Sequence, residues 1–306
     1  MARASFKASA PGKLMLLGEH AVLHGSRCIV CAVNQRMTVE VTPRDDRRIT
    51  IDSALGRFAT DLDNLQIDPT FRFILTAVKN FPQPLPGGFD LIVRSDFTST
   101  VGLGSSASVT AAMTAALFHL VNLPLDPQQI FAHSLKTVRA VQGAGSGADL
   151  AASVFGGVLL YRTVPPEIKQ LVHIHPLSVV YSGAKTPTTQ VIKLVEEKRM
   201  RFPNLFQKIY DAMDESAGLA AQAIGAQNWP RFGELLNLNQ GLMDALGVSS
   251  RVLSDIAYAL RGQPGILGAK ISGSGLGDCV VGLGEAGKFD YELLPLTMSR
   301  EGVRID

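Results

Sequence analysis

The sequence has few cysteines, and their arrangement excludes two kinds of site. Its three cysteines are an odd number, and Cys28 and Cys31 lie in an apolar run without a second pair nearby. Neither a disulfide framework nor a structural zinc site is therefore expected. Because side chains alternate across a strand, the two thiols should be buried on opposite faces. Buried, reduced thiols are the preferred interpretation.

Charge is also scarce, which argues against nucleic-acid binding. Charged residues make up 18% of the chain and the net charge is +2. A nucleic-acid-binding protein normally carries a strong basic excess or a basic stripe. The two densest basic runs, 44–48 and 198–201, are short and are interpreted as solvated surface. The sequence predicts no nucleic-acid partner.

No long apolar segment suggests a membrane span or a signal peptide. The most apolar stretch, 107–123, contains His119 and Asn122 and is short for a span. The first residues lack the apolar core of a signal peptide. We therefore expect a cytoplasmic protein without membrane association.

The length of 306 residues favours two lobes over one core. A proline-containing segment at 162–169 is the predicted boundary, which gives domains 1–165 and 166–306. The elements do not alternate regularly between strand and helix, so the predicted class is α+β. Strands are expected at 27–41, 48–53, 89–94, 157–161, 171–181, 266–272 and 279–283. Helices are expected at 70–80, 105–120, 127–141, 149–154, 187–197, 203–225, 229–246 and 249–261.

A glycine-rich loop stands between a predicted strand and a strongly apolar helix. Glycine lets a backbone approach an anion closely, and a helix N-terminus offers free N–H groups and partial positive charge. These features predict a phosphate site, although an ordinary turn with a serine cap fits the spacing as well. The loop lacks the P-loop pattern. Its residues are Val101, Gly102, Leu103, Gly104, Ser105, Ser106 and Ala107.

Three further segments carry candidate chemistry. Lys13 opens an apolar strand, where a lysine needs a charge partner or an anionic ligand unless it lies in solvent. Asp149 stands in a glycine-rich, apolar stretch, either as a helix cap or as a carboxylate that accepts a hydroxyl proton. The turn at 273–277 is either a plain hairpin or a wall of a phosphate site.

The order of these four segments resembles the GHMP kinase superfamily, which includes galactokinase, homoserine kinase, mevalonate kinase and phosphomevalonate kinase. The resemblance covers nearly the whole chain. The segment from Pro11-Gly12-Lys13 through Gly18-Glu19-His20 to Gly25 is most similar to the mevalonate kinase branch. The stretch 142–157 is more similar to phosphomevalonate kinases.

This resemblance implies a two-lobe α+β fold, with a ribosomal protein S5-like N-terminal lobe, a ferredoxin-like C-terminal lobe and the active site between them. It implies ATP-dependent phosphorylation of a small-molecule hydroxyl, with mevalonate converted to 5-phosphomevalonate. Asp149 would be the base, Lys13 its partner, loop 101–107 the ATP-binding segment and Ser106 the Mg²⁺-associated serine. A homodimer is the family-based expectation. The residues expected near the substrate are Glu19, His20, Ser146, Gly147, Ser272 and Gly273.

The sequence departs from the mevalonate kinase pattern at 142–147 and at two further places. Val138 occupies the position where mevalonate kinases usually carry a Mg²⁺-binding glutamate. Thr98 and Thr100 stand where the family's glycine loop usually begins. The metal ligands therefore stay open.

Two alternative functions also stay open. Phosphomevalonate or another acceptor is one, and a phosphorylated acceptor needs extra cations, for which Lys136, Arg139 and Lys185 are the candidates. The other is a sensor that binds nucleotide without turnover. Retention of both Lys13 and Asp149 argues against the sensor.

Overall fold

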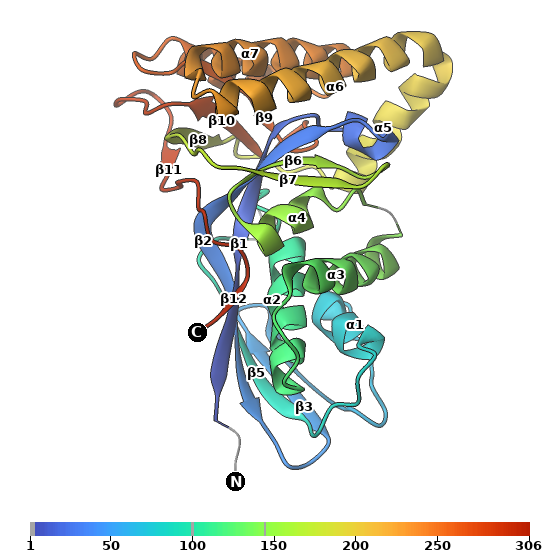
Figure 1. Cartoon of the computed structure of the whole chain (residues 1–306). Helices are drawn as coiled ribbons and strands as arrows, with labels where there is room; N and C mark the ends of the chain where they lie inside the picture. The colour runs from blue at the N-terminus through green and yellow to red at the C-terminus, as the bar shows by residue number, and fades with distance from the viewer. Residues whose placement is uncertain (1–3, 99–100, 144) are drawn as a thin grey trace.

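The computed structural model of the chain describes residues 4–98, 101–143 and 145–306. This part forms two sheets with helices packed against them, which confirms the α+β class (Figure 1). The larger sheet has the order β12-β1-β2-β5-β3-β4, and β6 joins it through β2 and carries β7. Its strands are β1 (Phe6–Leu17), β2 (Cys28–Pro43), β3 (Arg48–Ser53), β4 (Gly56–Asp61), β5 (Phe89–Ser95), β6 (Val158–Arg162), β7 (Glu167–Leu171) and β12 (Arg304–Ile305).

Strand β1 begins at Phe6, before the start that the sequence predicts at Lys13. Its pairing with β2 continues past Pro11, and the register shifts between Pro11 and Lys13. Proline has no N–H to donate to a ladder, so it is tolerated at such an irregularity. The shift places Lys13 opposite Ala32, with Leu14 opposite Cys31.

The cysteines of β2 behave as strand alternation predicts. Cys28 packs in one apolar cluster with Val30, whereas Cys31 packs in another with Ile29. Both thiols are free and buried, as is Cys279. Burial raises the pKa of the Cys31 thiol to about 12.

Helices α2 and α4 pack against the larger sheet, and α1 and α3 pack against α2. Almost every side chain of α2 is buried, which accounts for the apolar run that the sequence shows there. Asp126 caps α3 by accepting a hydrogen bond from the Gln128 N–H, at 2.9 Å. The bounds are α1 (Arg72–Asn80), α2 (Ser105–Leu120), α3 (Pro127–Gln142), α4 (Ala148–Phe155) and the short 3₁₀ helix η1 (Ala21–His24).

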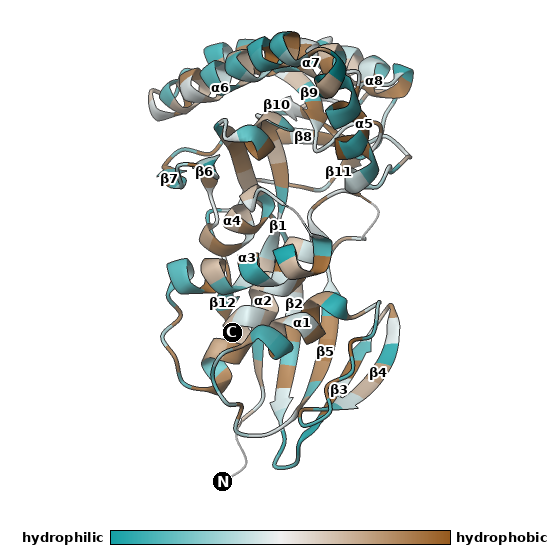
Figure 2. Cartoon of the chain, turned by 90° about the vertical axis from the view of Figure 1, so that its right-hand side faces the viewer, coloured by the Kyte–Doolittle hydropathy of each residue, from teal (hydrophilic) through white to brown (hydrophobic). Residues whose placement is uncertain are grey.

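The smaller sheet has the order β11-β8-β10-β9, and α6 and α7 lie at that end of the molecule (Figure 1), as does α8 (Figure 2). Helix α5 is largely hydrophilic, as its teal colour in Figure 2 shows. None of the described helices is long and apolar enough to cross a membrane. The remaining bounds are β8 (Leu177–Tyr181), β9 (Gly268–Ser272), β10 (Cys279–Leu283), β11 (Leu293–Leu294), α5 (Thr188–Arg201), α6 (Pro203–Gly225), α7 (Trp229–Leu246) and α8 (Arg251–Arg261).

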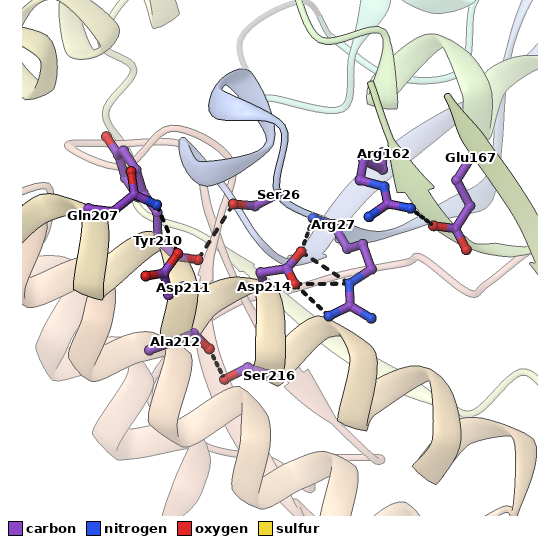
Figure 3. A network of polar contacts seen from close by, with 10 residues as sticks. All are labelled: Ser26, Arg27, Arg162, Glu167, Gln207, Tyr210, Asp211, Ala212, Asp214 and Ser216. Atoms are coloured by element: carbon purple, nitrogen blue, oxygen red, sulfur yellow. Dashed lines mark hydrogen bonds and ion pairs between the residues drawn. The ribbon is translucent and has the colours of Figure 1, made fainter. Parts of the chain in front are cut away.

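A polar contact joins the start of β2 to α6. The guanidinium and the backbone N–H of Arg27 both donate to the Asp214 carboxylate, with an N–H to Oδ1 distance of 2.6 Å (Figure 3). The side chains of this pair are each 30% exposed. The predicted domain boundary after residue 165 falls in the turn between β6 and β7, two strands of the same sheet, and it stays a prediction.

Candidate active site

A cleft of about 290 Å³ lies where the two sheets and their helices meet, close to the lower end of the usual size of small-molecule sites. Loops and helix ends from both halves of the chain contribute to it. Most residues that the sequence singles out line this cleft: Lys13, Glu19, His20, Gly102, Gly104, Ser105, Ser106, Ala107, Ser146, Gly147, Asp149 and Gly273.

Lys13 and Asp149 form an ion pair in the cleft. The Nζ atom of Lys13 lies 3.3 Å from Oδ2 of Asp149. The lysine side chain is 6% exposed, whereas the aspartate side chain is 46% exposed. One carboxylate therefore has its position fixed by a buried cation and still faces open space. This geometry suits a group that accepts a proton from a bound hydroxyl.

The glycine-rich loop at 101–107 is built around Lys13. The backbone N–H of Lys13 donates to the carbonyl of Leu103, at 2.9 Å. Gly104 has a φ of 78°, and a Cβ there would lie 2.8 Å from Cε of Lys13. Only glycine adopts this φ without strain and also leaves room for the side chain of Lys13. Helix α2 starts directly after Gly104 and its first residues line the cleft, so the helix end that carries free N–H groups lies at the cleft.

Helix α4 places Asp149 in its first turn. Gly147, at a φ of 88°, precedes the helix, and a Cβ at this position would lie 2.8 Å from the Tyr161 hydroxyl. Tyr161 and Thr163 both donate hydrogen bonds to the carbonyl of Ser146. The N-termini of α2 and α4 thus face the same cleft, and their dipoles favour an anion there.

The turn between β9 and β10 forms another wall. His20 contacts it through Nε2, which lies 2.8 Å from the carbonyl oxygen of Ser274. The N–H of Leu276 donates to the Val248 carbonyl, at 2.7 Å. Burial lowers the pKa of His20, although the Ser274 contact opposes this shift. The turn is therefore held in place from several elements.

Glu19 lines the cleft and lies in a buried ion pair. Its carboxylate accepts from the Lys270 ammonium and, at 3.3 Å, from the side-chain amide of Asn239. Lys270 and Glu19 side chains are 0% and 2% exposed. Burial lowers the pKa of Lys270, and Glu19 counteracts this effect. Glu19 lines the cleft, but its charge is already neutralised.

Other predicted residues lie at the edge of the site. Val101, Leu103 and Ser272 do not line the cleft among the described residues, because the two apolar side chains pack against a core and Ser272 is buried in β9. Thr100 lies outside the described residues. Of the proposed extra cations, Lys185 lines the cleft.

Sequence reasoning missed several residues of the cleft wall. Thr188, Thr189 and Ile192 come from α5, and Ser274 and Asp278 from the β9–β10 turn. The sequence of α5 does not indicate a place at the cleft, because its polar composition is typical of a surface helix. Asp278 carried a signal, since an acid directly follows three glycines spaced two apart.

The cleft contains oxygen ligands for a nucleotide-bound cation. Within residues 4–98, 101–143 and 145–306, no three His, Cys, Asp or Glu side chains group to hold a metal. A Mg²⁺ carried by ATP needs fewer, because phosphates and water supply most of its ligands. The Ser106 hydroxyl lies in the cleft, and Oδ1 of Asp278 is buried there without a partner among the described residues. The site therefore fits such a cation.

Comparison with known proteins gives consistent matches. Residues 72–157 match the model of the GHMP kinases N terminal domain, 207–289 the GHMP kinases C terminal model and 2–43 the galactokinase galactose-binding signature. The mevalonate kinase of Archaeoglobus fulgidus is 36% identical, over 98% of this chain and 99% of that protein.

Solved structures of kinases of this family superpose on the chain. L. major mevalonate kinase, in complex with R-mevalonate, superposes with a TM-score of 0.76 and 26% identity over 94% of this chain and 90% of its own. Streptococcus pneumoniae phosphomevalonate kinase gives a TM-score of 0.80 at 21% identity over 97% of this chain and 100% of its own. The second likeness speaks for the fold alone.

Proposed function

The chain belongs to the GHMP kinase family, and from this premise we propose that it phosphorylates mevalonate to 5-phosphomevalonate with ATP. The family assignment makes it an ATP-dependent kinase with the GHMP kinase fold that the sequence predicts. Mevalonate is proposed because the full-length relatives at 31% and 36% identity are mevalonate kinases. The chain covers 98% of the first and 99% of the second.

The observation that carries this proposal is the Lys13–Asp149 pair in front of two helix N-termini. The N–H groups of α2, with loop residues from Gly102 to Ala107, would bind the triphosphate. Asp149 would then face the acceptor hydroxyl with a half-exposed carboxylate. Lys13 would lie between the bound triphosphate and Asp149. Its ammonium would stabilise the negative charge that develops on the transferred phosphoryl group.

The reaction requires a transfer of one phosphoryl group. The acceptor oxygen forms a bond to the γ-phosphorus of ATP, and the bond from that phosphorus to the bridging oxygen of ADP breaks. Asp149 receives the hydroxyl proton or orients it for attack. Bound Mg²⁺ neutralises phosphate charge, and Ser106 would be one of its ligands. Catalysis is then mainly positioning and electrostatic stabilisation.

A coupled assay of ADP release tests the acceptor. The purified protein is given ATP and Mg²⁺ with mevalonate, phosphomevalonate, homoserine or galactose. We expect turnover with mevalonate to exceed turnover with each of the others. Galactose is included because residues 2–43 match the galactose-binding signature. Absence of turnover with mevalonate, while another acceptor reacts, would contradict the proposed substrate.

Phosphomevalonate is the second candidate, and one observation favours it. Lys185 lines the cleft and adds a cation that a phosphorylated acceptor needs. Lys136 and Arg139, in contrast, are exposed on α3. Replacing Lys185 by methionine should raise the KM for phosphomevalonate strongly if this candidate holds, and the KM for mevalonate much less.

Three further expectations stay predictions. They are a cytoplasmic location, a homodimer and the roles of Glu19 and His20 near the substrate. The sensor alternative is disfavoured because a buried lysine that fixes a half-exposed carboxylate has no use in nucleotide binding without turnover.

A further inference from the structure

Asp278 is a buried carboxylate that the mechanism above does not use. The residue is 6% exposed, and it lines the cleft at the end of the β9–β10 turn. Its Oδ1 atom is buried and has no hydrogen-bond partner in the described part of the chain. An unsatisfied buried carboxylate oxygen costs free energy, so a native structure that keeps one calls for an explanation.

The backbone holds this side chain in place at a further cost. Asp278 has a φ of 61°, in the left-handed region that favours glycine. Its N–H donates to the Ala184 carbonyl, and its own carbonyl accepts from the Ser182 N–H, both at 2.9 Å. The chain therefore fixes an aspartate where a glycine would be relaxed. Such strain is concentrated at functional sites.

The carboxylate lies against the phosphate loop. A Cβ at Gly102 would lie 2.8 Å from Oδ1 of Asp278, and a Cβ at Gly273 would lie 3.3 Å from Oδ2. The absence of side chains at positions 102 and 273 makes room for the carboxylate. The oxygen without a partner is the one on the side of the loop that would bind phosphates.

Apart from the helix N-termini, the side-chain charges around Asp278 add no net attraction for an anion beside it. Lys13 and Lys185 act electrostatically on Asp278, and Asp149 acts with the opposite sign. The two lysine charges and the two carboxylate charges cancel before any nucleotide arrives. A triphosphate next to Asp278 would then be repelled unless a cation lay between them.

A magnesium ion would both give Oδ1 of Asp278 a partner and separate the carboxylate from the triphosphate. Mg²⁺ is typically bound by one or two carboxylates together with phosphate oxygens and water. Val138 lines the same cleft from α3 but has no oxygen in its side chain. We propose that Asp278 is the carboxylate ligand of the nucleotide-bound Mg²⁺, supplied by the β9–β10 turn. This inference rests on the proposed kinase function.

The test measures metal and nucleotide binding apart from turnover. Mn²⁺ replaces Mg²⁺, and electron paramagnetic resonance reports free Mn²⁺ in the presence of the non-hydrolysable analogue β,γ-imido-ATP. Calorimetry measures the affinity of the analogue with and without Mn²⁺. The variants are Asp278→Asn and Asp278→Gly. Asp255→Asn, in an exposed ion pair on α8, is the matched control.

We expect both Asp278 variants to bind Mn²⁺ at least about tenfold more weakly in the ternary complex. Without metal, they should bind the analogue as tightly as the wild type or more tightly, because a repulsive charge is gone. The control should change neither value. Asp278→Gly should keep or raise the Tm, since glycine relaxes the left-handed backbone.

Three results would overturn the inference. These are an unchanged Mn²⁺ affinity, a loss of analogue affinity of the same size with and without metal, or a fall in the Tm of Asp278→Gly that marks a structural role. If the wild type phosphorylates its acceptor and the Asp278 variants bind Mn²⁺ as the wild type does, the inference about Asp278 is refuted and the proposed function is not. A wild type that binds no analogue refutes the proposed function with it.

Discussion

Two lysine–carboxylate pairs each contribute a carboxylate to the cleft wall, and they differ in the exposure of that carboxylate. The lysines are both buried, with side chains 6% exposed at Lys13 and 0% at Lys270. Their partners differ, because Asp149 is 46% exposed and Glu19 is 2% exposed. Asp149 can still meet a ligand, whereas Glu19 is closed off by Lys270 and Asn239.

We expect this difference to separate a reactive pair from a structural one. A carboxylate held by a buried cation but open on its other side can change its proton or hydrogen-bond partner during a reaction. A fully enclosed pair cannot do so, and removal of one partner leaves an uncompensated buried charge. The first pair should therefore control turnover, and the second should control stability.

The largest expected effect is on turnover in Asp149→Asn. The amide is nearly isosteric but cannot accept the proton, so kcat should fall about 10³-fold. ATP binding should persist because the loop and Lys13 are unchanged. Steady-state kinetics and calorimetry with ATP measure the two quantities. Turnover close to that of the wild type would remove Asp149 from the mechanism.

The second prediction concerns Lys270→Met. This change leaves Glu19 charged and buried, so the free energy of unfolding should fall by about 3–5 kcal/mol. The double variant Lys270→Met/Glu19→Leu should recover much of that loss, because no buried charge remains. Urea denaturation measures all variants. Equal stability of the single variant and the wild type would show that the pair is not structural.

The third prediction is the matched change in the open pair, Lys13→Met. Asp149 keeps its contact with solvent, so stability should change far less than in Lys270→Met. Turnover should fall about 10²-fold, since one group that stabilises the developing charge is lost. If Lys13→Met and Lys270→Met destabilise the fold equally, exposure of the carboxylate is not what distinguishes the pairs.

The smallest effect is expected for a pair away from the cleft. Arg27 and Asp214 are each 30% exposed at their side chains, so Arg27→Ala should lower the free energy of unfolding by only about 1 kcal/mol. The kcat should stay at the wild-type level. A large loss of turnover would mean that the contact between β2 and α6 also controls the cleft.

Short segments with a strong local pattern could be predicted from the sequence. Glycines and isolated charges that interrupt apolar runs mark the loop at 101–107, Lys13 and Asp149 as candidates, and the family resemblance gives them roles. The structure brings Lys13 and Asp149 together. The class and most helices followed from periodicity.

Contacts between distant parts of the chain could not be predicted in the same way. Lys270 and Glu19 are 251 residues apart, and nothing in either segment indicates that the two side chains pair. Asp278 stands out locally, but its unpartnered oxygen is visible only once Gly102 lies beside it. The two-residue strands β11 and β12 are too short to carry a pattern.

The strand β12 also has a consequence for the order of folding. It pairs with β1 at Ala8 and Ser9, in the same strand that carries Lys13. During synthesis on the ribosome, β1 therefore emerges long before residues 304–305 are available to pair with its edge. Until then β1 presents open hydrogen-bonding groups, which are a template for association with other chains. Lys13 thus lies on a strand that is made long before the strand that covers part of its edge.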